Sequence, residues 1–446
     1  MADIPENLAI PTRSSGANRS LESACDEARA RYVAGHPECQ ELFERAGRHL
    51  PGGNTRTVLF YEPFPLLIQR AKGANLFDAD GHSYLDFLGE FTAGLYGHSH
   101  PKIRAAIETA LGDGIVFGAP NRLEAELAEL VCARFPSCEM VRFCNSGTEA
   151  NLMALAAARG ATGREKILVF RAGYHGGVLS YTTPESPANV PFPIVLADYN
   201  DLEGARALIM AQASDIAAVL VEPMQGSAGA IPAVPGFLEG LRELTRSHGI
   251  ILIFDEVMTS RLTSGGLQEK LGVIPDMTTF GKYIGGGLSC GAFGGSERLM
   301  VQFDPRRPGS IGHSGTFNNN VLTMAAGIAG LRDVLTPEAL AAVNQSGEEL
   351  RERFNALAAQ HGAAVQATGL GSILCLHPQQ REKITQADDI TGSPTARALL
   401  QFYMIEQGIF FARRGFISLS LALGPEDLDS FAVAFESFLD EYADLL

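Results

Sequence analysis

The sequence predicts an α/β protein built on a largely parallel sheet with helices on its faces. Three short apolar runs, 166–170, 217–221 and 250–254, have the length and composition of buried parallel strands. Helical patterns over 202–213 and 236–248 separate these runs. Strands that alternate with helices in this way usually belong to one parallel sheet, because each helix carries the chain back across it.

The flanking regions predict smaller elements. Residues 1–20 have little periodicity and are expected to form a loose arm, whereas 21–50 carry apolar side chains at helical spacing. Residues 57–88 favour short strands joined by a hairpin turn at Asp80-Gly81-His82, and 101–135 return to helix.

These patterns predict three parts of the chain. Residues 1–95 would form an N-terminal segment of arm, helix and small-domain strands, and 96–325 a large α/β domain. Residues 326–446 would form a small α+β domain that ends in an amphipathic helix over 426–445.

Composition excludes several classes of function. The 446 residues are 46% hydrophobic and 19% charged, as in a globular protein, and the formal net charge of -16 argues against nucleic-acid or anionic-membrane partners. The seven cysteines lack metal-ligand spacing, so we expect reduced thiols and no metal site. Residues 1–6 lack a signal-peptide pattern and no apolar stretch nears the roughly 20 residues of a membrane span, so a cytoplasmic protein is expected.

The stretch 249–287 holds the main candidates for chemistry. Asp255 directly follows an apolar strand, and Lys282 lies among apolar residues shortly before three glycines. One interpretation is a structural ion pair. The other is a pyridoxal phosphate (PLP) site, where the lysine binds the cofactor covalently and the aspartate pairs with the ring nitrogen. The second interpretation needs a phosphate site and a residue that stacks on the ring.

Candidates for both follow predicted strands. Ser146-Gly147-Thr148 stands before a helical pattern, where it would form either an ordinary N-cap or a phosphate site at the helix N-terminus. Tyr174 follows another predicted strand, with glycines on both sides and His175 directly after it. Its ring would either lie flat on a planar cofactor or belong to a tyrosine on a surface turn. We give His175 a supporting role.

Two weaker candidates belong to the same set. Glu222 directly follows the strand 217–221 and would either orient the cofactor or terminate the strand in a turn. Thr316 lies in a polar loop before a helix and is a candidate second phosphate contact.

Arginines indicate a carboxylate substrate. Arg56 follows the turn Pro51-Gly52-Gly53, and Arg413-Arg414 lies between phenylalanines. Arginine binds carboxylates with two parallel hydrogen bonds, although a surface salt bridge is its commoner role.

Taken together, the stretches 145–150, 174–176, 255–259 and 281–287 resemble those of the class III (fold type I) PLP aminotransferases. Within these the chain is similar to the glutamate-1-semialdehyde aminomutase branch, which shares the Pro-Gly-Gly turn. The stretches 55–61 and 411–416 resemble those of the aromatic β-amino-acid (β-phenylalanine) aminotransferases. The resemblance covers about residues 45–440 and implies a seven-stranded, mainly parallel sheet.

The resemblance also implies roles for individual residues. Lys282 should bind the cofactor and move the proton, Asp255 should pair with the ring nitrogen, and Tyr174 should stack on the ring. Ser146, Gly147 and Thr148 should hold the phosphate, and Thr316 should reach in from the partner subunit of a homodimer.

Two arginines receive substrate roles from the same resemblance. Arg56 should bind the carboxylate of a β-amino acid, and Arg414 that of the keto-acid acceptor. The apolar side chains at 58–61 beside Arg56 would suit an aryl or alkyl group of the donor.

Several positions depart from the wider family. Met258 stands where ornithine-type relatives have a glutamine, and Ser227 where they have the glutamate that pairs with the switching arginine. Ser260-Arg261 replaces the glycine and aromatic residue of the aminomutases, and the turn continues Asn54-Thr55-Arg56 instead of their longer pattern. The aminomutase-specific differences argue against aminomutase activity.

The expected function is therefore a ping-pong aminotransferase that takes the amino group of an aromatic β-amino acid and passes it to 2-oxoglutarate or pyruvate. The alternative within the family is an intramolecular aminomutase, which would need no added keto acid. The alternative from another class is a catalytically silent PLP-binding protein, although Lys282 and Asp255 are both present.

Overall fold

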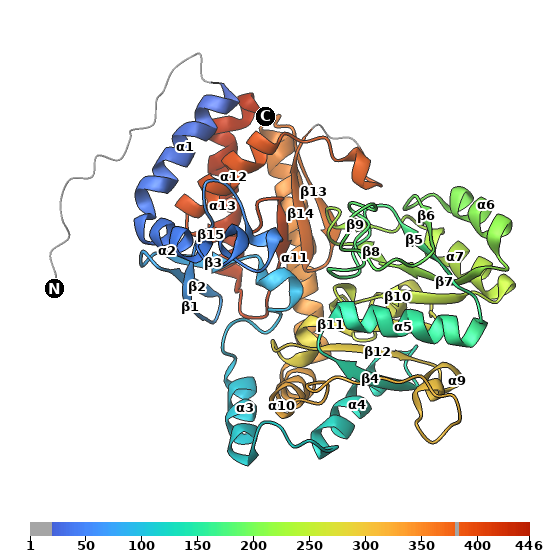
Figure 1. Ribbon diagram of the computed structural model, residues 1–446. Helices are drawn as coiled ribbons and strands as arrows, with labels where there is room; N and C mark the ends of the chain where they lie inside the picture. Colours follow the sequence, from blue (N-terminus) through green and yellow to red (C-terminus); the bar gives the residue numbers. More distant parts are fainter. Residues whose placement is uncertain (1–19, 380–382) are drawn as a thin grey trace.

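A computed structural model describes residues 20–379 and 383–446, so nearly all of the predicted arm lies outside the described residues. Its largest sheet has seven strands in the order β4-β12-β11-β10-β7-β5-β6 (Figure 1). Only β12 runs antiparallel to its neighbours, so the predicted mainly parallel sheet is confirmed. The strands are β4 (Met140–Cys144), β5 (Lys166–Phe170), β6 (Ile194–Ala197), β7 (Ile216–Val221), β10 (Ile251–Asp255), β11 (Met277–Gly281) and β12 (Gly291–Gly295).

Helices cover both faces of this sheet. Ile251 and Ile253 of β10 share a buried cluster with α5, whereas Leu252 and Phe254 share one with α6 and α7 on the opposite face. Successive residues of a strand point to opposite faces, which is why a strand covered on both sides is apolar throughout. These helices are α5 (Gly147–Thr162), α6 (Leu202–Gln212) and α7 (Phe237–His248). Further helices of this domain are α3 (Pro101–Asp113), α4 (Arg122–Arg134), α8 (Leu267–Leu271), α9 (Glu297–Met300) and α10 (Val321–Ile328).

The small α+β domain draws on both ends of the chain, as the blue and red elements lying together in Figure 1 show. The strand order β1-β2-β3-β15 joins N-terminal strands to a C-terminal one, and β13-β14-β16 forms a second sheet. Its strands are β1 (Ile68–Lys72), β2 (Asn75–Asp78), β3 (Ser83–Asp86), β13 (Val365–Leu370), β14 (Ile373–Pro378), β15 (Ile409–Phe410) and β16 (Phe416–Ser418). Its helices are α1 (Leu21–Gly35), α2 (Pro37–Gly47), α11 (Pro337–Gln360), α12 (Pro394–Glu406) and α13 (Pro425–Tyr442).

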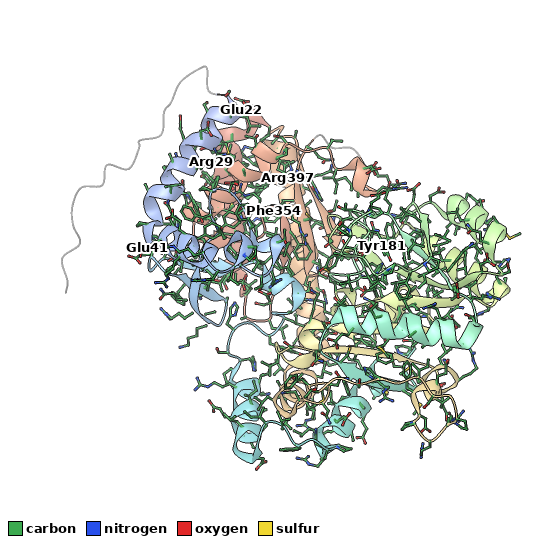
Figure 2. All side chains as sticks on the ribbon, in the orientation of Figure 1. Glu22, Arg29, Glu41, Tyr181, Phe354 and Arg397 are labelled. Atoms are coloured by element: carbon green, nitrogen blue, oxygen red, sulfur yellow. The ribbon has the colours of Figure 1, made fainter. Side chains whose placement is uncertain are left out.

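Aromatic side chains fill the interior of the small domain. Phe354 of α11, labelled in Figure 2, lies in this domain. Its ring packs against those of Phe431 and Phe435 of α13, with ring centroids 4.9 Å apart in both pairs. The domain limits at 95/96 and 325/326 remain a prediction.

Three predicted elements differ from the structure. The helix over 21–50 is two helices, because Pro37 starts a new one, and the helix over 101–135 is likewise interrupted, between α3 and α4. Strand structure in 57–88 begins only at Ile68, since the preceding residues form a 3₁₀ turn followed by a segment with two prolines, which cannot donate ladder hydrogen bonds. The hairpin turn between β2 and β3 is where the sequence predicts it.

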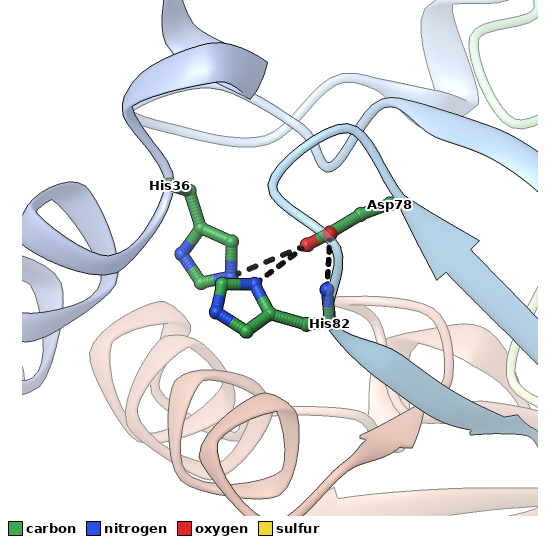
Figure 3. Close-up of side chains that lie close together, drawn as sticks. All are labelled: His36, Asp78 and His82. Carbon is green, nitrogen blue, oxygen red and sulfur yellow. Dashed lines mark hydrogen bonds and ion pairs between the residues drawn. The ribbon is translucent and has the colours of Figure 1, made fainter. Parts of the chain in front are cut away.

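A cluster of polar side chains fastens the α1–α2 junction to this hairpin (Figure 3). Asp78 Oδ2 accepts hydrogen bonds from the Tyr84 hydroxyl at 2.7 Å and from His82 Nδ1 at 3.0 Å, and His36 Nε2 lies 3.7 Å away. The spacing of His36, Asp78 and His82 would also admit a metal ion. Because hydrogen bonds already engage all three side chains, we assign them a structural role.

Two global expectations concern cysteines and membranes. All seven cysteines lie in the described part of the chain, and none of them forms a disulfide there. Among the described helices, none has the length and apolar character needed to cross a membrane.

Candidate active site

The carboxyl ends of five strands bring the predicted residues to one edge of the large sheet. Ser146, Tyr174 and Glu222 lie just beyond β4, β5 and β7, while Asp255 ends β10 and Lys282 follows β11. These strands run in the same direction, so the five side chains line one cleft of about 760 Å³. Ligands of open α/β sheets bind at this edge.

Lys282 lies partly buried in the cleft and adopts a left-handed backbone, with φ of 56°. Burial lowers the pKa of its amine to about 8, while the nearby charges of Glu90 and Asp255 oppose this shift and those of Arg56 and Arg414 add to it. The uncharged amine is the nucleophile, so a lowered pKa makes more of it available near neutral pH.

Asp255 is buried and held by donors on both of its oxygens. Oδ2 accepts hydrogen bonds from His175 Nδ1 and Asn151 Nδ2, both at 2.8 Å, and Oδ1 accepts one from the Val257 N–H at 3.1 Å. Across the described residues no ion pair links this carboxylate to Lys282, so the interpretation as a structural ion pair is not supported. A fixed carboxylate of this kind suits a protonated ring nitrogen.

Asn151 is a site residue that sequence reasoning missed. The Thr279 hydroxyl donates to Asn151 Oδ1 at 2.8 Å, which directs the amide N–H₂ group toward Asp255. The available signal was an asparagine at a buried position of the alanine-rich helix α5, because buried polar side chains need specific partners.

At the start of α5, Ser146-Gly147-Thr148 can both cap the helix and bind a phosphate. Ser146 is the N-cap, and its Oγ accepts from the Glu149 N–H at 3.2 Å. The N–H groups of Gly147 and Thr148 still have no intrahelical acceptor, and both residues line the cleft. Such a helix start can therefore bind a phosphate.

The loop after β5 packs tightly on this helix start. The Thr148 hydroxyl accepts from the Gly177 N–H at 3.2 Å. Gly176 has φ of 124°, and a Cβ there would lie 2.1 Å from Thr148 Oγ1, so only glycine allows this approach.

Glu222 acts on the same loop. Its Oε2 accepts from the Tyr174 N–H at 2.9 Å and its Oε1 from the Gly226 N–H at 3.1 Å, while burial raises the pKa of its carboxyl to about 7. Glu222 thereby fixes the backbone that presents the Tyr174 ring, which is 44% exposed in the single chain.

Two of the three predicted arginines reach the cleft. The guanidinium carbons of Arg56 and Arg414 lie 5.6 and 5.1 Å from the ring centroid of Phe91. Arg413 lies instead over the Phe402 ring at 4.4 Å and donates to the Glu62 carbonyl at 3.1 Å. The structure therefore directs Arg414, and not Arg413, toward Lys282.

Sequence reasoning also missed the segment that contacts Arg56. Glu90 forms an ion pair with Arg56, and Glu90, Phe91 and Thr92 have φ values of 46°, 51° and 81°. Arg261, fully buried, donates to Ser418 Oγ at 3.0 Å and contacts the Thr92 carbonyl at 3.5 Å. Arg261, one of the two residues at which the chain departs from the aminomutases, therefore supports the segment 90–92.

The structure corrects one expectation and leaves another as a prediction. Of the apolar residues at 58–61, only Val58 lines this cleft, because the chain turns at Thr57–Leu59 instead of continuing as a strand. Thr316 is exposed and lies outside the cleft-lining residues, so its assignment to a partner subunit remains a prediction.

A parallel α/β sheet with a lysine, a fixed carboxylate and an open helix start at one edge has the chemistry that PLP requires. The chain belongs to the class-III aminotransferase family, whose model matches residues 60–415. It is a PLP-dependent transaminase of fold type I, which confirms the predicted enzyme class and cofactor.

Several individual proteins of this family are similar to the chain over most of its length. The chain is 51% identical to the β-phenylalanine transaminase of Variovorax paradoxus, over 96% of this chain and 98% of that protein. The crystal structure of a β-phenylalanine aminotransferase from the same organism matches with a TM-score of 0.94 and 51% identity, covering 96% of this chain and 99% of that one. A glutamate-1-semialdehyde 2,1-aminomutase of Heliobacterium modesticaldum is 38% identical over 90% of this chain and 96% of that protein. An ω-transaminase structure from Sphaerobacter thermophilus matches with a TM-score of 0.86 and 39% identity, covering 92% and 99%.

Proposed function

We propose that this transaminase takes the amino group of an aromatic β-amino acid, such as β-phenylalanine, and passes it to 2-oxoglutarate or pyruvate in a ping-pong cycle. The observation that carries this proposal is the pair of arginines, Arg56 and Arg414, in the cleft that contains Lys282. The 51% identity to the β-phenylalanine transaminase of V. paradoxus supports the choice of donor.

Two carboxylate sites suit two substrates of different length. A β-amino acid carries its carboxylate one carbon further from the reacting nitrogen than an α-amino acid does. Arg56 would bind this carboxylate, and Arg414 would bind that of the α-keto acid, each with a bidentate pair of hydrogen bonds. Both substrates could then place their reacting carbon beside Lys282 in turn.

Apolar surface is available for the donor's aryl group. Val58, Phe91, Met224 and Met258 line the cleft together with the arginines. Met258, which replaces the glutamine of ornithine-type relatives, adds apolar surface at this place. The cleft would therefore favour an aryl side chain by burial.

Bound PLP supplies a ring that withdraws electrons from the substrate's reacting carbon. Lys282 would hold the proton that moves to and from that carbon, and Asp255 would keep the ring nitrogen protonated. Ser146, Gly147 and Thr148 would bind the phosphate group. Tyr174 would cover one face of the ring, His175 would orient Asp255, and Glu222 would keep Tyr174 in place.

The same proposal includes assembly and location. Thr316 would complete the phosphate site of a partner subunit, which makes the working unit a homodimer with shared active sites. The seven free thiols support a cytoplasmic setting. We also propose the large domain at 96–325, flanked by small-domain parts at 1–95 and 326–446.

A single-turnover experiment tests the donor. Purified holoenzyme is mixed with β-phenylalanine without a keto acid, and the absorbance of the cofactor is followed from its aldehyde form to its amine form. Conversion followed by recovery on adding 2-oxoglutarate or pyruvate is expected. No conversion would reject this donor, and turnover that needs no keto acid would favour the aminomutase alternative.

A further inference from the structure

The two arginines of the cleft differ in how their charges are balanced. Arg56 pairs with Glu90 through a single contact, Nη1 to Oε1, and the two side chains are 42% and 51% exposed in the single chain. Arg414 is half-buried, takes part in no ion pair within the described ranges, and has a buried Nε without a hydrogen-bond partner. One site therefore already contains a carboxylate, whereas the other has an uncompensated cation.

The backbone that presents Glu90 is strained. Three consecutive non-glycine residues, Glu90 to Thr92, occupy the left-handed region, which L-residues rarely adopt in succession. Gly89 before them has φ of 51°, and a Cβ there would lie 2.6 Å from the Ser418 carbonyl oxygen. Backbone of this kind persists only where the surroundings fix it, and it concentrates at functional sites.

The surroundings do fix this turn from both sides. Asp86 Oδ1 accepts hydrogen bonds from the N–H groups of Leu88 and Gly89, both at 3.0 Å. On the other side Arg261 binds Ser418 Oγ and contacts the Thr92 carbonyl. Glu90 is thus held at a set place facing Arg56, with about half of its side chain exposed to solvent.

We propose that Glu90 is a positioning residue that holds the Arg56 guanidinium between turnovers and is exchanged for the carboxylate of the amino donor. This inference rests on the proposed role of Arg56. Glu90 uses one N–H of the guanidinium, whereas a donor carboxylate in the cleft can use two. An ion pair this exposed is weak, so the exchange costs little.

Glu90 also separates the two substrates. Its negative charge beside Arg56 disfavours a second carboxylate at that site, so a dicarboxylic acceptor such as 2-oxoglutarate binds through Arg414. The donor displaces Glu90 with its one carboxylate and fills the rest of the site with an apolar aryl group, whereas a dicarboxylic acceptor would bring a further negative charge close to Glu90. The ion pair therefore works as a specificity device through Arg56, without contact to the reacting atoms.

The test measures binding of 3-phenylpropionate to the holoenzyme by calorimetry. This molecule has the donor's carboxylate and aryl group but no amino group, so it cannot react. Glu90→Gln removes the competing charge and is expected to tighten binding roughly two- to fivefold, the range of an exposed ion pair. Glu108→Gln breaks a similarly exposed pair with Arg104 on α3 and should leave binding unchanged.

Arg56→Ala separates the possible outcomes. It should weaken binding of 3-phenylpropionate by roughly 10- to 150-fold, and Glu90→Gln should have no further effect in that background. If Glu90→Gln leaves binding unchanged or weakens it while Arg56→Ala weakens it strongly, the role of Glu90 is wrong and the donor site stands. If Arg56→Ala binds like the wild type, the donor site itself is wrong.

Steady-state kinetics distinguish loss of the Glu90 charge from distortion of the turn at 89–92. In Glu90→Gln the KM for β-phenylalanine should fall at constant kcat, and inhibition by excess 2-oxoglutarate should appear at several-fold lower concentration. A merely structural loss would instead lower kcat with both substrates, and that result would overturn the proposal.

Discussion

The two ends of the active-site cleft are built differently. The cofactor end, where PLP is proposed to bind, consists of Lys282, Asp255, Asn151 and His175, at the ends of sheet strands or on the helix packed against them. Its carboxylate is buried and bound by donors on both oxygens. The substrate end consists of Arg56, Glu90, Phe91 and Arg414, and lies on turns with exposed charges and left-handed backbone.

This difference separates chemistry from selectivity. The cofactor end has to hold the same groups for every substrate, so a rigid sheet edge with satisfied hydrogen bonds serves it. The substrate end has to accept two different molecules in turn, and weak, exchangeable contacts serve that purpose. Variants of the first region should abolish turnover with all substrates, and variants of the second should discriminate between them.

The largest effect is expected for Lys282→Ala. Turnover should fall below detection for every donor and acceptor, by more than the roughly 10²–10⁴-fold attributed to acid–base catalysis alone, because both the covalent link and the proton carrier are lost. Steady-state rates and the absorbance of the bound cofactor measure this. Lys270→Ala, on the exposed face of α8, is the control, and substantial turnover by Lys282→Ala would refute the assignment.

A smaller but still uniform loss is expected for Asp255→Asn. The neutral amide no longer favours a protonated ring nitrogen, and loss of one preorganised electrostatic group typically costs roughly 10²–10³-fold in kcat. Both half-reactions should slow alike in stopped-flow traces. Asp198→Asn, which breaks an exposed pair with Arg171, should change neither. Slowing of only one half-reaction would contradict the division between the two ends.

The sequence predicts the cofactor end well for a physical reason. Ser146, Tyr174, Glu222 and Asp255 each lie at or just after the end of an apolar strand, and parallel strands bring such ends together. Lys282 follows β11 in the same way. Local patterns were sufficient for these five residues because the strands of one sheet position them, whereas Asn151, which was missed, comes from helix α5.

The substrate end could not be predicted in full from the same patterns. Glu90 meets Arg56 across the left-handed turn at 89–92, where only Gly89 is a residue type that signals positive φ. The turn at Thr57–Leu59 likewise moves Phe60 and Tyr61 away from the cleft. Such contacts depend on packing between distant segments, as between Arg261 and Ser418.

Truncating each arginine separately tests whether the donor and the acceptor use different carboxylate sites. Arg56→Ala should slow the β-phenylalanine half-reaction, and Arg414→Ala the keto-acid half-reaction, each by roughly 10- to 150-fold. That range corresponds to about 1.5–3 kcal/mol for hydrogen bonds to a charged group. Stopped-flow measurement of each half-reaction checks this. Arg413→Ala, which removes a side chain directed away from the cleft, should change neither half-reaction selectively, and equal losses in both would remove the distinction between the two sites.

The smallest effect on turnover is expected at His377, behind the substrate end. Its ring is 2% exposed and its Nε2 lies 2.8 Å from Thr368 Oγ1 and 3.2 Å from the Gly229 carbonyl oxygen. Burial lowers the pKa of His377 to about 4, against 6.5 for an exposed histidine. As the pH falls from 6.5 toward 4, the unfolded chain takes up a proton that the folded chain excludes. The stabilisation by neutral His377 is therefore present above pH 6.5 and is lost on acidification, by an amount of the order of 2–3 kcal/mol.

His377→Asn separates this contribution from the other titrating groups, since asparagine does not titrate. The difference in unfolding free energy between pH 7.5 and pH 5, measured by denaturant titration of the holoenzyme, should be smaller in the variant than in the wild type. Rates at pH 7.5 should change little, because His377 contacts Thr368 and Gly229 and not the residues around Lys282. An unchanged pH dependence would mean that the ring is already protonated in the folded state. The loop at Gly229 would then owe its position to a charged hydrogen bond instead of a neutral one.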